Sequence, residues 1–186
     1  ACCGMPNLDG GDVAAAQTKI RKNVELLLPH VREGRKIVVP GPTCGYTMKH
    51  EWPVYLDTPE AKEVAGAVVD LMEFLEGLRK SHDLELEFSR SLGSVGYHAA
   101  CHLRAQKIGT PGARLLGKVP DTSVKIVQEC SAVDGTWGMK AAYYEEGRKY
   151  AQRMTKGMEE GGFDLFVGDC NLAGQRLIGE TGKPMV

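Results

Sequence analysis

The amino-acid sequence predicts an α/β fold of two pseudo-repeated lobes, each a small, mainly parallel sheet flanked by helices, with cysteines at the carboxyl ends of strands. Short apolar runs alternate with longer amphipathic stretches, which is the pattern of parallel strands joined by helical crossovers. Four of these runs each end close to a cysteine: Cys44, Cys101, Cys130 and Cys170. In open α/β sheets, ligands bind at this edge. The sequence therefore predicts that thiols gather along one edge of a sheet.

The first lobe is expected to cover residues 1–90, and it opens on the vicinal pair Cys2 and Cys3 followed by a glycine. A helix is predicted over residues 12–33, because apolar residues recur there at the spacing of one helical face. These residues are Val24, Leu27, Leu28 and Val31. We interpret this stripe as core.

A strand over residues 36–40 leads to Cys44. A second helix is predicted over residues 60–80, where the apolar positions again share one helical face. They are Val64, Val68, Leu71, Met72 and Leu75. The polar stretch that follows, residues 81–93, is expected to contain the boundary between the lobes.

The second lobe is expected to cover residues 91–186. Its predicted elements are a strand to Cys101, a short helix over residues 112–117, a strand to Cys130, a long helix over residues 139–160 and a last strand to Cys170. Asp134 or Thr136 would cap the long helix, whose positive end would then face Cys130.

The two lobes resemble each other when the cysteines are aligned. The intervals from Cys2 to Cys44 and from Cys130 to Cys170 share one order: a cysteine at a turn, a long helix, a glycine-containing break, a strand and a cysteine. The second lobe has one more strand, ending at Cys101, ahead of its repeat. We therefore expect the chain to be the carboxyl-terminal part of a longer polypeptide.

Composition limits the function classes. The chain has 186 residues, 42% of them hydrophobic, and a formal net charge of −1. This is enough for a core and gives no indication of nucleic-acid binding. No apolar run reaches the roughly 20 residues of a membrane helix, and we expect no signal peptide. We expect a cytoplasmic protein that is not integral to a membrane, although peripheral association with the inner face of a membrane would be compatible with this composition.

Six cysteines allow three interpretations. A disulfide framework is typical of small domains that lack an adequate core, whereas this chain has long amphipathic helices. In a reducing compartment, clustered thiols bind metal or exchange electrons. Thiolates are soft donors that suit iron–sulfur clusters and zinc. Metal binding is therefore favoured, and thiol–disulfide exchange, including at the vicinal pair, remains an alternative.

Several segments resemble the cysteine-rich CCG domains found in one subunit of heterodisulfide reductase, in one subunit of anaerobic glycerol-3-phosphate dehydrogenase and in related iron–sulfur oxidoreductases. They are Cys2-Cys3-Gly4, Gly41-Pro42-Thr43-Cys44, Tyr97-His98-Ala99-Ala100-Cys101-His102, Cys130 with Asp134-Gly135-Thr136-Trp137-Gly138-Met139-Lys140, and Gly168-Asp169-Cys170. The resemblance covers essentially the whole chain.

The resemblance implies one cysteine-ligated site in each lobe. Its metal ligands would be Cys2, Cys3 and Cys44 in the first lobe and Cys101, Cys130 and Cys170 in the second. It also implies an electron-transfer or catalytic role within an oxidoreductase, with an iron–sulfur cofactor. The fullest members of the family hold noncubane clusters, but three cysteines per lobe, with an upstream cysteine to complete the first set, favour a [4Fe-4S] cluster here. The redox partner would be a flavoprotein or a ferredoxin-domain protein.

The chain departs from the fullest CCG pattern in its second lobe. Cys130 is followed by Ser131 and Ala132 where those members have Cys-Gly, so three cysteines remain in that lobe. His98, His102, Asp134, Asp169, Ser131, water or a substrate could supply a further ligand, or the histidines could be hydrogen-bond donors beside the ligands. Zinc in one lobe, or a zinc-stabilised or cluster-free scaffold, therefore stays an alternative.

Overall fold

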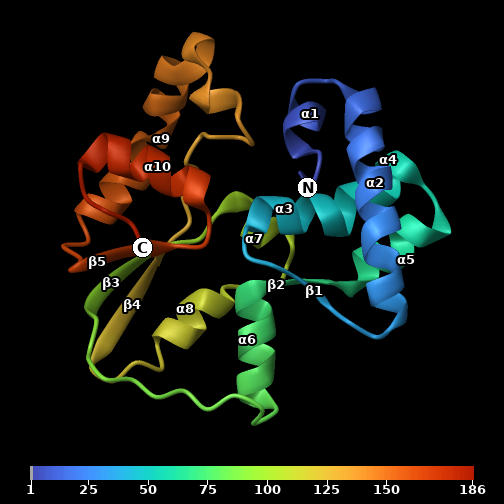
Figure 1. The fold of residues 1–186 in the computed structure, drawn as a ribbon. Coiled ribbons are helices and arrows are strands. Elements are labelled where there is room, and N and C mark those ends of the chain that lie inside the picture. The colour runs from blue at the N-terminus through green and yellow to red at the C-terminus, as the bar shows by residue number, and fades with distance from the viewer. Residues whose placement is uncertain (1) are drawn as a thin grey trace. The chain divides into compact units, whose positions relative to one another are not determined.

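The computed structural model describes residues 2–186 and divides into two compact units, the first ending at Leu71 and the second running from Met72 to Val186. Both units combine helices with a small parallel sheet, which confirms the predicted α/β class (Figure 1). The boundary between the compact units precedes the 90/91 division expected from the sequence. That division into two CCG lobes remains a prediction.

The first unit contains six helical segments and two strands within its described residues. They are α1 (Met5–Asp9), α2 (Val13–Arg32), β1 (Ile37–Val39), α3 (Pro42–Tyr46), a π-helical turn (Thr47–Glu51), α4 (Trp52–Leu56), α5 (Pro59–Ala67) and β2 (Val68–Asp70). The predicted first helix is confirmed, and the Asp12 carboxylate caps it by accepting a hydrogen bond from the Ala15 N–H at 3.0 Å. The strand before Cys44 is also confirmed.

The single helix predicted over residues 60–80 is wrong, because a strand interrupts it. Helix α5 ends at Ala67, β2 follows, and α6 (Leu71–Lys80) begins after it. Val68 and Val69 are β-branched, and they pair in parallel with Ile37 and Val38 of β1. Apolar spacing alone did not reveal the break, since Val68 is buried in the strand as it would have been in a helix.

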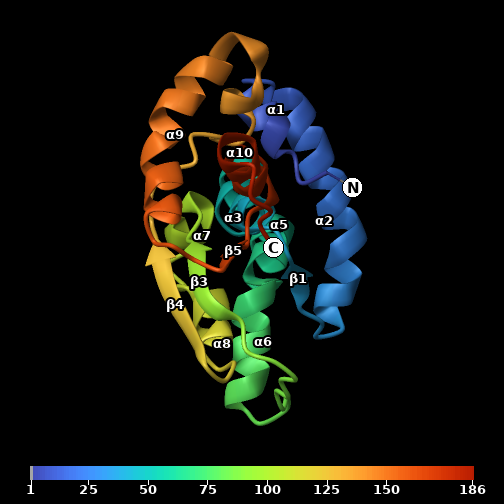
Figure 2. The ribbon, with the colours of Figure 1, turned by 90° about the vertical axis from the view of Figure 1, so that its left-hand side faces the viewer.

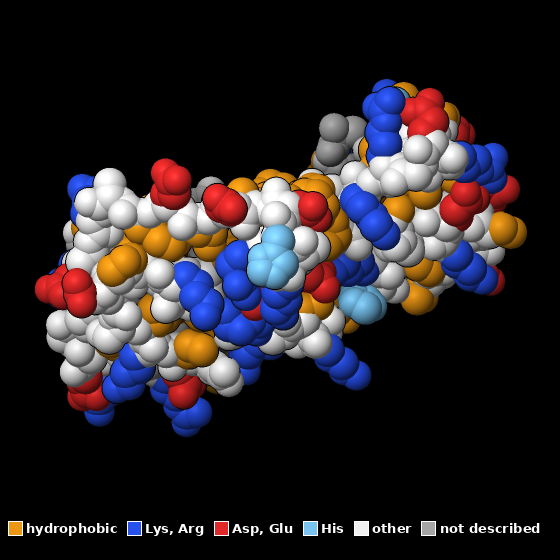
Figure 3. Space-filling model, turned by 90° about the horizontal axis from the view of Figure 1, so that it is seen from below, with side chains coloured by type: hydrophobic (Ala, Val, Ile, Leu, Met, Phe, Trp, Pro, Cys, Tyr) orange, Lys and Arg blue, Asp and Glu red, His pale blue; other side chains and the backbone are white. Residues whose placement is uncertain are grey.

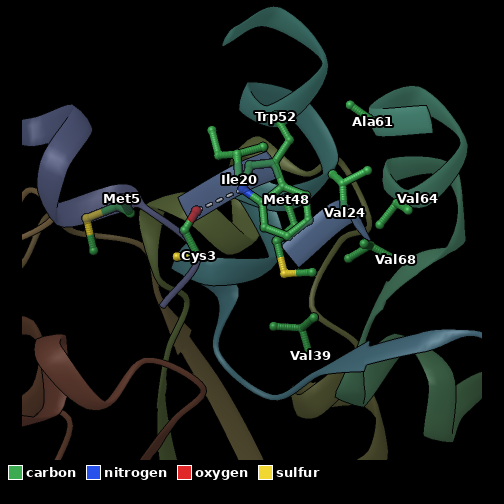
Figure 4. Close-up of a cluster of buried hydrophobic side chains, with 10 residues drawn as sticks. All are labelled: Cys3, Met5, Ile20, Val24, Val39, Met48, Trp52, Ala61, Val64 and Val68. Atoms are coloured by element: carbon green, nitrogen blue, oxygen red, sulfur yellow. Dashed lines mark hydrogen bonds between the residues drawn. The ribbon is translucent and has the colours of Figure 1, made fainter. Parts of the chain in front are cut away.

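The core of the first unit surrounds Trp52, whose side chain is 1% exposed (Figure 4). Ile20 and Val24 from α2, Met48 and residues of α5 pack around it. Cys3 belongs to the same cluster. The first cysteine motif is therefore attached directly to the core.

The second unit has a three-stranded parallel sheet in the order β4-β3-β5. After α6 its elements are β3 (Gly93–His98), α7 (Cys101–Ala105), α8 (Pro111–Leu116), β4 (Thr122–Val127), two 3₁₀ turns (Trp137–Met139 and Ala141–Tyr143), α9 (Tyr144–Glu159), β5 (Leu165–Gly168) and α10 (Asn171–Thr181). The three strands predicted for this lobe are confirmed. Helix α10 was not predicted from the sequence.

The long helix predicted to start at residue 139 begins later, at Tyr144. Lys140 is extended, with ψ at 139°, and separates the two 3₁₀ turns. Asp134 has a positive φ of 43°, and the Thr136 side chain makes no capping hydrogen bond to the turn that follows it. The expected cap is therefore wrong, and so is the expectation that a helix starting at Met139 directs its positive end toward Cys130.

Helices cover both faces of the second sheet (Figure 2). Phe166 and Val127 pack with Met154 and Met158 of α9, whereas the neighbouring Val167 packs with α7 and α8. Successive strand residues point to opposite faces, so these two clusters lie on the two sides of the sheet. The unit is a three-layer α/β/α arrangement.

The face shown in Figure 3 carries basic, acidic and hydrophobic side chains, with several Lys and Arg side chains gathered beside a histidine. Within residues 2–186, no helix is long and apolar enough to cross a membrane.

Candidate functional site

In the first unit, the structure brings two of the three cysteines together. Cys3 precedes α1 and is buried, and Cys44 lies in α3 just after β1. Their sulfur atoms are 3.4 Å apart. Cys2 is exposed.

Two side chains from the helices hold the backbone of the vicinal pair. The Trp52 indole N–H donates a hydrogen bond of 2.8 Å to the Cys3 carbonyl oxygen (Figure 4). The Asn23 side-chain amide donates one of 2.9 Å to the Cys2 carbonyl oxygen. Gly4 then turns the chain into α1 with a φ of +98°, a conformation that favours glycine. Neither Asn23 nor the hydrogen-bonding role of Trp52 was predicted, because both depend on contacts distant in sequence.

The Cys3–Cys44 pair favours the protonated thiol in the absence of metal. The hydrogen bond to Cys44 raises the pKa of the Cys3 thiol far above its ordinary value, and burial raises it further. Since metal ligands must be thiolates, metal binding at this pair would release protons.

In the second unit, the cysteines follow the three strands of one parallel sheet. Cys101 is the first residue of α7, Cys130 follows β4, and Cys170 immediately precedes α10. The pKa of the Cys101 thiol is raised, first by burial, then by the charges of Cys130 and also Cys170, while the His102 and Cys101 backbone N–H groups oppose this rise. Cys101 therefore lies within range of the charge of each of the other two thiols.

A tightly packed loop carries Cys130. The Cys130 sulfur accepts a hydrogen bond of 3.3 Å from the Ala132 N–H. The buried Arg176 donates to the Gly138 carbonyl oxygen, and a side chain at position 138 would overlap the Ala132 carbonyl oxygen. This is why glycine is required there.

The remaining candidates have different surroundings. His98 is buried, and its Nε2 lies 2.9 Å from the Glu129 carbonyl oxygen. Burial lowers the pKa of His98. Asp169 accepts a hydrogen bond from the Tyr97 hydroxyl. His102 is half-buried in α7, next to Cys101, and Asp134 is exposed in the Cys130 loop.

The cysteine sulfur atoms suit a soft metal, but the described side chains do not form a closed metal site. Within residues 2–186, no group of three or more His, Cys, Asp or Glu side chains is arranged to hold a metal ion. The 3.4 Å separation of the Cys3 and Cys44 sulfurs is near the roughly 3.8 Å between two thiolates on one tetrahedral zinc ion with bonds of about 2.3 Å.

Comparison with known proteins gives a distant relationship. No family model matches the chain. The chain is 24% identical over 177 residues to the C subunit of the anaerobic glycerol-3-phosphate dehydrogenase of Escherichia coli (strain K12), and equally to that of Escherichia coli O157:H7. The match covers 91% of this chain and 43% of each relative. The chain thus spans less than half the length of these curated relatives.

Proposed function

We propose that this chain is an iron–sulfur-binding part of an oxidoreductase and that it transfers electrons. The observation that supports it best is the placement of Cys101, Cys130 and Cys170 after the three strands of one parallel sheet. Thiolates gathered at one edge of a sheet would repel one another, and a bound cationic cluster would remove that repulsion. The distant similarity to part of a dehydrogenase supports the same class of function.

The proposed ligands are the three cysteines of each unit: Cys2, Cys3 and Cys44 in the first, and Cys101, Cys130 and Cys170 in the second. A bound cluster, [4Fe-4S] in our proposal, would accept and release single electrons. The chain itself supplies thiolates, and at Cys101 it supplies backbone N–H donors that stabilise negative charge on sulfur.

We propose His102 or Asp134 as the further ligand in the second unit, or as a hydrogen-bond partner of the cysteines. His98 and Asp169 fit supporting roles better. The first is buried against the Glu129 carbonyl oxygen and the second accepts a hydrogen bond from Tyr97. The proposed partner is a redox protein such as a flavoprotein or a ferredoxin-domain protein, and the proposed location is the cytoplasm, including the inner face of the membrane.

Iron and acid-labile sulfide per polypeptide test this function in anaerobically prepared protein. We expect both at cluster stoichiometry, with a partial loss in Cys130→Ser and a separate partial loss in Cys44→Ser. The matched control is Ser123→Ala, an exposed change on β4 that should leave both values unchanged. Zinc without sulfide would instead support the scaffold alternative.

Thiol–disulfide exchange is a second candidate, favoured by the 3.4 Å between the Cys3 and Cys44 sulfurs. A substrate disulfide would be reduced to two thiols as Cys3 and Cys44 lose two protons and two electrons and form a disulfide. The raised pKa of Cys3 disfavours the attacking thiolate, so this candidate ranks second. Mass spectrometry after incubation with oxidised glutathione tests it, since exchange would produce a Cys3–Cys44 disulfide and released glutathione.

A further inference from the structure

The second unit contains an apolar pocket with a volume of about 200 Å³. Its walls come from α6, the segment between α6 and β3, α8 and β5, and they include Leu75, Phe88, Leu116 and Val167. None of the proposed cysteine ligands lines it.

One end of the pocket is polar. The Tyr97 hydroxyl donates a hydrogen bond to the Asp169 carboxylate, and both residues line the pocket. Asp169 is the one charged side chain among the described residues that line the pocket. A carboxylate can accept several hydrogen bonds, so Asp169 can receive one from Tyr97 and another from a ligand.

Gly112 of α8 keeps this polar end open. A Cβ at position 112 would lie 3.0 Å from Asp169 Oδ1 and 3.0 Å from the Tyr97 hydroxyl oxygen. The backbone at Gly112 does not have the positive φ that would by itself favour glycine. The close approach of the two polar side chains is therefore what makes glycine suitable here.

We propose that this pocket binds a small neutral molecule with an apolar body the size of one substituted aromatic ring and a single O–H or N–H donor directed at Asp169. A cavity of roughly 150 Å³ lined by aliphatic and aromatic side chains can hold benzene, so this pocket has room for a ring with one or two substituents. Anions are disfavoured, because the single charged lining side chain is negative. Binding in this pocket needs no metal, and none of the proposed cysteine ligands lines it.

Titration of the full chain with 4-methylphenol, followed by methyl NMR, tests the proposal. We expect saturable shifts confined to pocket methyl groups, such as those of Met72, Leu116 and Val167. 4-Methylanisole has nearly the same shape but no donor, and it should bind about tenfold more weakly, since a hydrogen bond to a charged acceptor is worth at least one decade. 4-Methylbenzoate should cause no saturable shifts.

Two variants locate the site. Leu116→Trp fills the pocket and should abolish binding, whereas the control Leu26→Trp, on an exposed position of α2, should not. Asp169→Asn preserves the shape and should reduce the preference for 4-methylphenol over 4-methylanisole, because charge-assisted hydrogen bonds are stronger than neutral ones. No saturable shifts with wild type, equal affinity for both probes, or an unchanged preference in Asp169→Asn would each overturn the proposal.

Discussion

Replacing Trp52 with Phe should loosen Cys3 selectively. Trp52 is 1% exposed, and its indole N–H donates the 2.8 Å hydrogen bond to the Cys3 carbonyl oxygen. Phe removes this donor and leaves a buried carbonyl without it, which costs about 1–3 kcal/mol. The smaller ring also leaves unfilled volume in the core, adding about 1 kcal/mol. We therefore expect a destabilisation of about 2–4 kcal/mol around Cys3.

The assay is the rate at which the Cys3 thiol of metal-free protein is alkylated, read by peptide mass spectrometry. Labelling of the buried thiol requires local opening, so a loss of about 2 kcal/mol should raise the rate about 30-fold. Trp137→Phe, in the second unit, is the matched control and should leave the rate unchanged. If the Cys3 rate is unchanged in Trp52→Phe, or rises equally in both variants, the Trp52 hydrogen bond does not hold Cys3 in place.

Three further predictions concern the second unit. Gly138→Ala should lower its free energy of unfolding by more than about 2 kcal/mol in thermal or urea unfolding, because the new methyl group would overlap a backbone carbonyl oxygen. Arg114→Met should lower the free energy of unfolding by about 2 kcal/mol. It leaves the Glu76 carboxylate, which is 6% exposed, without the guanidinium that binds it through two nitrogens. Breaking a fully buried pair would cost about 3–5 kcal/mol, but the Arg114 side chain is half-exposed, which reduces the cost. As the pH falls below about 6.5, the free energy of unfolding of the wild type, measured with urea, should decrease, whereas that of His98→Gln should not. The reason is that the pKa of His98 is lowered in the folded protein, so the unfolded chain binds the proton more readily.

Each of these predictions has a matched control. Gly66→Ala, in α5 with open space around the new methyl group, should be neutral or stabilising by up to about 1 kcal/mol. Arg153→Met and His82→Gln change exposed side chains and should leave stability and its pH dependence nearly unchanged. If a control behaves as its partner variant does, the structural reason given for that partner is wrong.

Local pattern predicted much of the fold. The strands ahead of Cys44, Cys101, Cys130 and Cys170 were found because each is a short apolar run that ends in turn residues. The helix after Asp12 was found because its apolar residues recur at helical spacing. Such signals lie within a few residues of the element they define.

Features that depend on distant contacts were missed. Strand β2 exists because Val68 and Val69 pair with β1, a contact that the helical spacing of the same residues concealed. The late start of α9 was missed for a local reason, because the extended Lys140 interrupts the predicted helix. The Trp52 contact with Cys3 and the Tyr97 contact with Asp169 join residues far apart in the chain. No local periodicity encodes these contacts.

X-ray absorption at the iron and zinc edges of the anaerobically prepared protein is the most direct test of whether this chain binds an iron–sulfur cluster through its cysteines. We expect iron with sulfur neighbours from both cysteine thiolates and inorganic sulfide, and a signal that falls when Cys101, Cys130 and Cys170 are replaced together by serine. Zinc bound by cysteine sulfur with no iron, or no bound metal in protein whose thiols are all reduced, would contradict it.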